Sequence, residues 1–313
     1  MTASRRGATG LSGVLVVDKP AGMTSHDVVA AVRRSTGERR IGHAGTLDPA
    51  ATGVLVVLIG PATRLAPYLT AAEKSYLARI AFGTQTATDD AEGEPVRLAP
   101  VPDRLGEDAY AESVLEGLIG SHEQLPPVYS AIKRDGVTAY RAARAGAPLT
   151  LDPRSIEVID ARLVGIGREP DICWDASFTV SKGTYLRSIA RDLGHSLETV
   201  AHLGALRRTA SGSLTLADAH PLDRVIAEGA DLADLFIDPV HALDLPVRIV
   251  SAEEATRVSH GVSLPLAAEA AGSIHPGAPV SVADSQHLHA IYALSADGGV
   301  LHPMSVIAGG VPR

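Results

Sequence analysis

The most distinctive hydrophobic pattern lies at residues 54–59, where six apolar residues, VLVVLI, follow one another without polar alternation. Such a run is typical of a strand that is buried on both faces in the interior of a sheet. The stretch before it, RIGHAGTLDPAATG at residues 40–53, is polar and contains several glycines. Pro49 favours an extended conformation at Asp48. The pattern therefore predicts a carboxylate presented on a stiff loop that is attached to a buried strand.

The pattern elsewhere predicts a chain of mixed helices and strands. Strands are expected at residues 14–17 and 75–82, and clean alternation predicts another at 174–181 with Ala176, Phe178 and Val180 on one face. Further strands are expected at 280–282, 288–294 and 300–307. Capping and periodicity signals predict helices at 25–35 with Ser25 as N-cap, at 105–119, from Arg187 to Gly194, at 222–236, and after a capping box of Ser251 and Glu254.

Residues 125–151 differ from both kinds of pattern. The segment opens with two prolines, is interrupted by Gly136, Gly146 and Pro148, and is rich in basic residues, among them Lys133, Arg141 and Arg144. We expect a long excursion without a compact, self-packed element, of the kind that usually has a function. An acidic cluster at residues 89–94 is expected to lie in another loop, away from any face that the basic segment contributes to.

Composition limits the class of protein. The 313 residues are 45% hydrophobic, which is enough for one large domain or two with well-buried cores. A single cysteine, Cys173, excludes an internal disulfide framework and a cysteine-rich zinc site. We find no apolar run of 18 residues and no signal peptide, so no membrane association is expected and the localisation expected is cytoplasmic. The net charge of −8 argues against a polyanionic partner, but the local basic density at 133–154 outweighs it.

The stretch GHAGTLDPAATGVL resembles the catalytic segment of the TruB family of tRNA pseudouridine synthases. Four further stretches resemble other blocks of that family in the same order: LSGVLVVDKPAGMTS, KSYLARIAFGTQT, LPPVYSAIK and SKGTYLRSIARDLG. An ordered set of this kind is far more specific than a single short motif. One departure is visible at Ala87, where family members usually carry an aspartate.

The resemblance implies the site residues. Asp48 is the expected catalytic carboxylate, Arg187 is expected to keep it charged, and Tyr76 to stack on the target base beside Tyr185. His43 is expected to fill the space that a flipped base leaves. Lys19 is expected to have a structural or RNA-facing role, and the segment with Lys133, Arg141 and Arg144 to act as a thumb on RNA.

The implied fold class is α+β, with the mixed, largely antiparallel sheet of the pseudouridine synthase fold and a small C-terminal β-rich, PUA-like domain. We expect residues 1–244 to form the catalytic domain, with the thumb-like insertion at about 125–151, and residues 245–313 to form the second RNA-binding domain.

The implied function is conversion of uridine to pseudouridine at position 55 in the T loop of tRNA. It requires no cofactor and no metal, and the chain is expected to act as a monomer without a protein partner. A non-catalytic RNA-binding protein is the main alternative, and it predicts no penalty for replacing Asp48. An aspartate-dependent hydrolase or phosphotransferase is disfavoured, because no second carboxylate, phosphate loop or metal motif lies near Asp48.

Overall fold

The computed structural model describes residues 9–130, 132–134, 136–169, 171–266 and 274–313. Residue 135, which belongs to the basic segment predicted at 125–151, lies outside this range. The chain divides into two compact units: Met1–Ala72 with Ala210–Arg313, and Glu73–Thr209. We call these unit 1 and unit 2 and describe each by itself.

The first stretch of unit 1 is organised around the predicted central strand. Strand β3 (Thr52–Ile59) pairs antiparallel with β1 (Gly13–Lys19) and with β2 (Ile41–Ala44). Its residues from Val54 to Ile59 are all 0% exposed, which confirms the expected burial on both faces. Helix α1 (Ser25–Thr36) connects β1 to β2, and η1 (Gly60–Leu65) and α2 (Ala66–Ala71) follow β3.

The chain returns to unit 1 after residue 209. Its elements there are β13 (Leu214–Thr215), η3 (Leu216–Asp218), β14 (His220–Pro221), α6 (Leu222–Glu228), η4 (Leu232–Leu235), β15 (Phe236–Ile237) and α7 (Pro239–Leu243). β14 pairs with β1 in parallel and β15 pairs with it antiparallel. The helix expected at 222–236 is therefore two shorter helices, separated at Gly229, whose φ of 57° ends α6.

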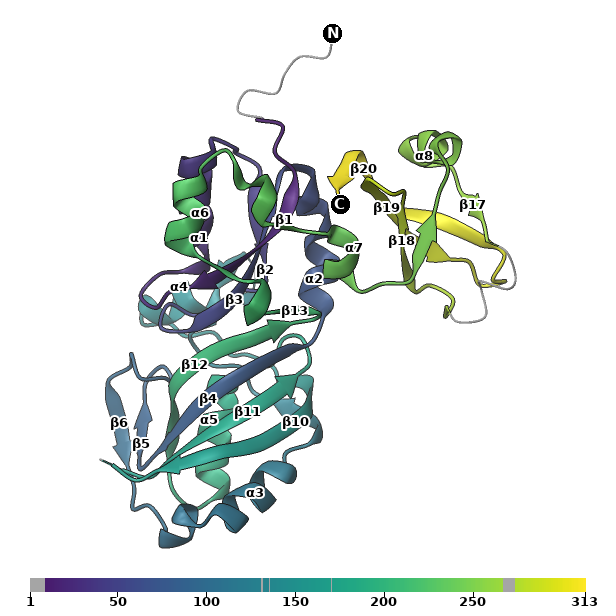
Figure 1. Ribbon diagram of the computed structural model, residues 1–313. Helices are drawn as coiled ribbons and strands as arrows, with labels where there is room; N and C mark the ends of the chain where they lie inside the picture. The colour runs from purple at the N-terminus through teal and green to yellow at the C-terminus, as the bar shows by residue number, and fades with distance from the viewer. Residues whose placement is uncertain (1–8, 131, 135, 170, 267–273) are drawn as a thin grey trace. The chain divides into compact units, whose positions relative to one another are not determined.

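A five-stranded sheet occupies the last part of unit 1. It contains β16 (Val247–Ile249), β17 (Leu264–Pro265), β18 (Pro279–Ala283), β19 (His287–Leu294) and β20 (Val300–Pro312), in the order β16-β18-β19-β20-β17. Helix α8 (Ala252–Ser259) packs on β19 and β20 (Figure 1). The predicted strands and the Ser251–Glu254 capping box are confirmed.

One hydrophobic core joins these stretches of unit 1. Val14, Val56 and Leu69 from its beginning share a cluster of buried residues with Leu288 and Ile307 from the last sheet. A second cluster, around Val258, Val282 and Tyr292, lies within the last sheet and α8. The boundary at residue 244 stays a prediction, while the core of the first cluster continues across it.

Unit 2 is built on long antiparallel strands. The order is β12 (Ala201–Ser211), β4 (Lys74–Phe82), β11 (Cys173–Val180), β10 (Arg154–Gly167) and β7 (Gly120–Gln124). Helix α3 (Asp108–Glu116) packs on β10 and α5 (Leu186–Ser196) packs on β4 (Figure 1). The alternation predicted for β11 is confirmed, with Trp174, Ala176, Phe178 and Val180 buried. The largely antiparallel, mixed α+β architecture is confirmed as well.

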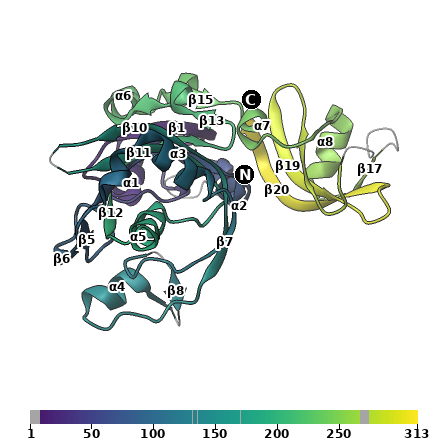
Figure 2. The ribbon, with the colours of Figure 1, turned by 90° about the horizontal axis from the view of Figure 1, so that it is seen from below.

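Smaller elements of unit 2 add detail to two expectations. The polar loop after β4 forms a hairpin of β5 (Thr84–Thr86) and β6 (Pro95–Leu98), and η2 (Asp103–Gly106) leads into α3. The excursion at 125–151, for which no compact element was expected, holds short local elements: a hairpin of β8 (Lys133–Arg134) and β9 (Val137–Thr138), and helix α4 (Ala139–Arg144). Figure 2 shows α4 and β8 beyond α5, off the strands of unit 2.

Three helix ends differ from the prediction. Thr24 is the N-cap of α1, and its capping box with Asp27 replaces the expected cap at Ser25. Helix α5 continues past Gly194 to Ser196. Gly194 is a packing position, since a Cβ there would lie 2.4 Å from the backbone nitrogen of Ala201. Helix α1 ends one residue later than expected, at Thr36, and Gly37 with its left-handed backbone is the C-cap.

Candidate active site

Asp48 lies in the connection between β2 and β3 of unit 1. Gly45 has φ of 96°, a conformation that favours glycine, and it opens this loop directly after β2. Within the loop the amide of Ala51 donates to the carbonyl of Asp48 at 3.1 Å. The side chain of Asp48 is half-buried and Thr46 is exposed. The rigid antiparallel pair on both sides of the loop thus limits where the carboxylate can move.

Two buried side chains anchor the loop on either side of Asp48. Lys19 is 0% exposed, and its Nζ donates to the carbonyls of Pro20, Met23 and Pro49 at 2.8, 2.6 and 3.1 Å. The hydroxyl of Ser25 accepts from the amide of Leu47 at 2.9 Å and donates to its carbonyl at 3.2 Å. Residues 47 and 49 are therefore both held. Of the two roles that the sequence left open for Lys19, this geometry supports the structural one.

His43 lies on β2, opposite Val57 of β3, and is half-buried. Its ring meets the ring of His26 from helix α1 edge to face, with centroids 5.3 Å apart. His26 is exposed and follows Ser25, so the contact links His43 to the same start of α1 that holds the loop. His43 and Asp48 thus occupy the two ends of one short, braced segment.

In unit 2, Tyr76 lies on β4, opposite Phe178 of β11, and is 9% exposed. Its hydroxyl is hydrogen-bonded to Arg208, whose side chain is almost completely buried and whose pKa is lowered by that burial. Lys74, two residues earlier, is also buried, and burial, together with the neighbouring Arg208 and Lys182, lowers its pKa to about 8. Tyr76 therefore lies beside two buried cationic side chains, Lys74 and Arg208, for which the sequence predicted no role.

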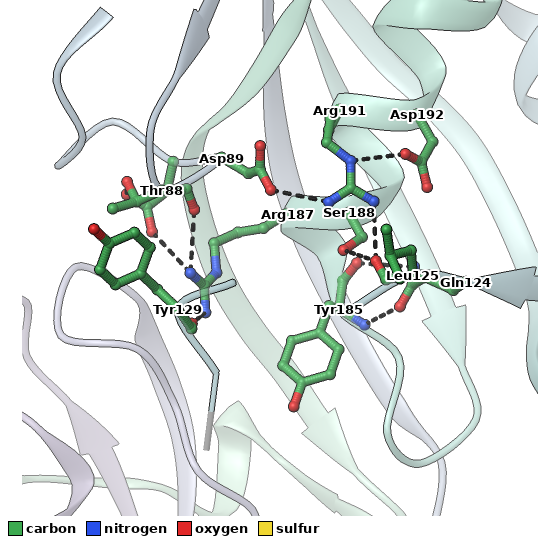
Figure 3. Close-up of polar contacts among 11 residues, drawn as sticks. Thr88, Asp89, Gln124, Leu125, Tyr129, Tyr185, Arg187, Ser188, Arg191 and Asp192 are labelled. Atoms are coloured by element: carbon green, nitrogen blue, oxygen red, sulfur yellow. Dashed lines mark hydrogen bonds and ion pairs between the residues drawn. The ribbon is translucent and has the colours of Figure 1, made fainter. Parts of the chain in front are cut away.

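Tyr185 and Arg187 lie where β11 gives way to α5, as expected. Gln124 at the end of β7 holds Tyr185 through both backbone groups, by accepting from its amide at 2.9 Å and donating to its carbonyl at 3.1 Å. Arg187 is 5% exposed. Its guanidinium donates to the carbonyls of Thr88 and Tyr129 at 3.2 and 2.9 Å, as Figure 3 shows. It also pairs with the Asp90 carboxylate at 3.5 Å.

The acidic loop of residues 89–94 lies differently from the expectation. Asp89 and Asp90 have side chains only 11% and 14% exposed, and they pair with Arg191 and Arg187 of α5. The sequence-based expectation was a separate loop away from the basic segment, and it did not include these ion pairs. A signal was present, since Arg187 and Arg191 are four residues apart and so share one face of a helix. Ala87, where the family pattern has an aspartate, is exposed.

The basic residues of the 125–151 segment are placed on its surface. Lys133, Arg141 and Arg144 are all exposed, and the Arg144 guanidinium lies over the ring of Tyr140 at 5.3 Å. The hydroxyl of Thr138 caps α4 by accepting from the amide of Arg141. Among the residues that the structure describes, no group of three or more histidine, cysteine, aspartate or glutamate side chains is placed to hold a metal ion. Nor, in that same part of the chain, is any helix long and apolar enough to cross a membrane.

Comparison with solved structures identifies the fold class. A chain in the crystal structure of a Cbf5-Nop10-Gar1 complex has a TM-score of 0.71 at 24% identity, over 96% of this chain and 87% of that one. A chain in the archaeal box H/ACA sRNP Nop10-Cbf5 complex has a TM-score of 0.68 at 23% identity, over 94% and 86%. The fold is that of the pseudouridine synthases.

Sequence comparison narrows the class to a family. The N-terminal domain model of the TruB family pseudouridylate synthases matches residues 33–186, and the tRNA pseudouridylate synthase B C-terminal domain model matches 187–242. tRNA pseudouridine synthase B of Thermobifida fusca is 49% identical over 254 residues, which cover 80% of this chain and 85% of that protein. The Opitutus terrae protein of the same name is 46% identical over 69% and 88%. The chain belongs to the TruB family of pseudouridine synthases and is an isomerase.

Proposed function

We propose that this enzyme converts uridine to pseudouridine at position 55 in the T loop of tRNA, with Asp48 as its catalytic carboxylate. The relatives named tRNA pseudouridine synthase B support tRNA as the substrate. The observation that carries the role of Asp48 is the anchoring of residues 47 and 49 by Ser25 and Lys19, which leaves a half-buried carboxylate between two held backbone positions. Such restraint is what a group acting on one atom of a substrate requires.

The reaction exchanges one bond for another within the substrate. The bond from N1 of uracil to C1′ of the ribose breaks, a bond from C5 to C1′ forms, the C5 proton is released and N1 takes one up. There is no net redox change. A base in a folded loop is reached only after it is flipped out. In this proposal Tyr76 stacks on the flipped base and His43 fills the space that the base leaves. Arg187 supplies the positive charge that keeps Asp48 ionised.

Replacing Asp48 tests the catalytic role. Asp48→Asn keeps the shape of the side chain but removes its negative charge and its basicity, so we expect product formation to be lost while tRNA affinity is nearly unchanged. The measurement is pseudouridine mapping in an unmodified tRNA transcript, with Asp231→Asn, an exposed aspartate of the same unit, as the matched control. A transcript with cytidine at position 55 should give no product. Pseudouridine at other positions of that transcript, or turnover by purified Asp48→Asn, contradicts the proposal.

The basic segment is the proposed grip on tRNA. Arg141 and Arg144 are exposed, and phosphate contacts release counterions, so affinity should fall as salt rises. Arg141→Ala with Arg144→Ala should flatten the slope of log affinity against log salt by up to about two units. Two variants serve as controls. Arg144→Lys keeps the positive charge of the segment, and Arg104→Ala with Arg224→Ala removes two arginines that lie elsewhere on the chain. Parallel slopes for wild type and the Arg141 and Arg144 double variant would show that tRNA is gripped elsewhere.

A further inference from the structure

Helix α5 carries two arginines with largely buried side chains, one turn apart, of which the proposed function uses only one. Arg187 and Arg191 have side chains 6% and 14% exposed. Residues four apart on a helix lie on the same face. A buried arginine is retained only where charge and hydrogen-bond partners compensate the loss of water. Arg191 pairs with its neighbour Asp192 at 2.8 Å, a half-exposed carboxylate on the same helix. Its two partners outside α5 indicate what the residue is for.

The first partner is the loop that supports Arg187. Asp89 pairs with Arg191 at 3.1 Å, while the flanking residues Thr88 and Asp90 contact Arg187 at 3.2 and 3.5 Å. Asp89 has φ of 59°, a left-handed conformation that is unfavourable for most residues other than glycine. Its carboxylate is largely buried, and this burial raises its pKa. Backbone hydrogen bonds with Leu203 of β12 hold the other side of this loop.

The second partner is the segment that follows β7. Arg191 Nη2 donates to the carbonyl of Leu125 at 2.9 Å, and Ser188 Oγ donates to the same carbonyl at 2.9 Å. Four residues further along the chain, the carbonyl of Tyr129 accepts from Arg187. Each of the two arginines thus bridges the same pair of segments, 88–90 and 125–129, as Figure 3 shows.

We propose that the Arg191–Asp89 ion pair is a positioning pair, which holds these two segments at the spacing that aims the Arg187 guanidinium. The inference rests on the proposed function, because it takes Arg187 to be a substrate-site residue. The Arg187 guanidinium donates to two loop carbonyls. Its position therefore depends on the positions of the two loops that carry them. Arg191 fixes both loops, with a charged contact to Asp89 and a contact to the backbone of Leu125, each four residues or fewer from the atoms that Arg187 uses.

The test compares Arg191→Gln and Asp89→Asn with a variant of a second, more exposed ion pair in the same unit. Arg79 and Asp175, on β4 and β11, pair at 2.8 Å with the Arg79 side chain 52% exposed, so Arg79→Gln removes an ion pair remote from α5 in sequence. With tRNA at saturating enzyme, we expect the single-turnover rate of Arg191→Gln and of Asp89→Asn to fall about tenfold, since small misplacement of a site group costs this much or more. The tRNA dissociation constant should change less than about threefold. Arg79→Gln should keep the wild-type rate.

Two further measurements distinguish a role in positioning Arg187 from a role in the stability of the fold alone. The double variant Asp89→Asn with Arg191→Gln should be no slower than the slower single variant, because both single changes already break the same Arg191–Asp89 ion pair. Arg191→Lys should recover part of the rate, since it restores the charge opposite Asp89 but not the contact with Leu125. If all variants lose thermal stability while the rate per folded enzyme stays at the Arg79→Gln level, the pair is structural only and the inference is wrong.

A readout without tRNA keeps the inference testable on its own. In the free Arg191→Gln enzyme, hydrogen exchange should be faster than in wild type in peptides that cover 86–92 and 125–130. If Arg191→Gln does not fold, Arg191→Lys takes its place. Exchange in the same peptides should be unchanged in Arg79→Gln. Unchanged exchange in both segments overturns the positioning role. A wild-type enzyme inactive on tRNA would instead contradict the proposed function, and the exchange result would still decide the role of Arg191.

Discussion

Lys19, Lys74, Arg187 and Arg208 are buried cations, each at most 6% exposed. Hydrophobic periodicity places charged residues outside, so it misplaces all four. The family resemblance drew attention to Lys19 and Arg187, whereas Lys74 and Arg208 received no role from the sequence. Their burial depends on carbonyl and hydroxyl groups around them, and some of these come from segments distant in the chain: Pro49 for Lys19 and Tyr76 for Arg208. Such partners are visible only after folding.

Lys74 makes stability depend on pH in an unusual direction. Its pKa is about 8 in the folded chain against 10.5 unfolded, so between these values the unfolded chain holds a proton that the folded chain has released. The free energy of unfolding contributed by Lys74 therefore rises with pH, by up to about 1.4 kcal/mol per pH unit. Below about pH 8 the full cost of burying the charge remains. Urea unfolding of wild type and Lys74→Met from pH 7 to 10 should show that the free energy of unfolding of wild type rises relative to that of the variant above pH 8. If the two free energies change with pH in parallel, the pKa of Lys74 is not lowered.

The elements with a strong local signal were predictable. The unbroken apolar run gave β3, clean alternation gave β11, and the Ser251 capping box gave α8. The predictions were wrong or missing where neighbouring residues fit the same local pattern equally well, or where an element is too short to show one. Thr24 and Ser25 both carry a hydroxyl that suits an N-cap, and the choice between them depends on a loop more than twenty residues away, because Ser25 is occupied by Leu47. The hairpin of β8 and β9 has only two residues in each strand, too few to show a period.

The two neighbouring hydroxyls should therefore have separable effects. Thr24→Ala removes the cap of α1 and should lower the free energy of unfolding by about 1 kcal/mol, with little change in the rate on bound tRNA. Ser25→Ala removes two hydrogen bonds to Leu47 and frees one side of the Asp48 loop, so it should lower the single-turnover rate about tenfold. Urea unfolding and single-turnover kinetics on both variants check this. If Thr24→Ala were the slower enzyme, the loop would not be held as described.

At the scale of the whole chain, order along the sequence was a poor guide to which parts pack together. Unit 1 takes its residues from both ends of the chain, and unit 2 is inserted between them. Motifs in the right order identified the family and the candidate residues, because motifs are local. They cannot show that Leu69 and Ile307 share a core, since that depends on packing between segments more than 200 residues apart. The same limit hid the pairing of Asp89 with Arg191.

This shared core sets the expected result of removing residues 245–313. The sheet that would be lost contributes Ala283, Leu288, Ile291, Ile307 and Val311 to the first core cluster of unit 1. Arg313 pairs with Asp238 at 2.9 Å, and Arg64 donates to the carbonyl of Val306. Burial of each large aliphatic side chain is worth about 1.5–3 kcal/mol, and the whole stability of a domain is about 5–15 kcal/mol. A chain ending at residue 244 should therefore be strongly destabilised, rather than a folded enzyme with weaker RNA binding.

Point variants on one strand test this without deleting the sheet. Ile307 and Met304 both lie on β20, but Ile307 is 3% exposed in the shared core and Met304 is 54% exposed. Ile307→Ala should lower the free energy of unfolding by about 2–5 kcal/mol. Met304→Ala should change it by less than about 0.5 kcal/mol. Urea unfolding followed by a probe in the first stretch of unit 1, such as hydrogen exchange of β3, should show the loss in Ile307→Ala. Full protection of β3 in Ile307→Ala, or in the truncated chain, would mean that residues 245–313 form a separately stable domain whose removal affects RNA affinity alone.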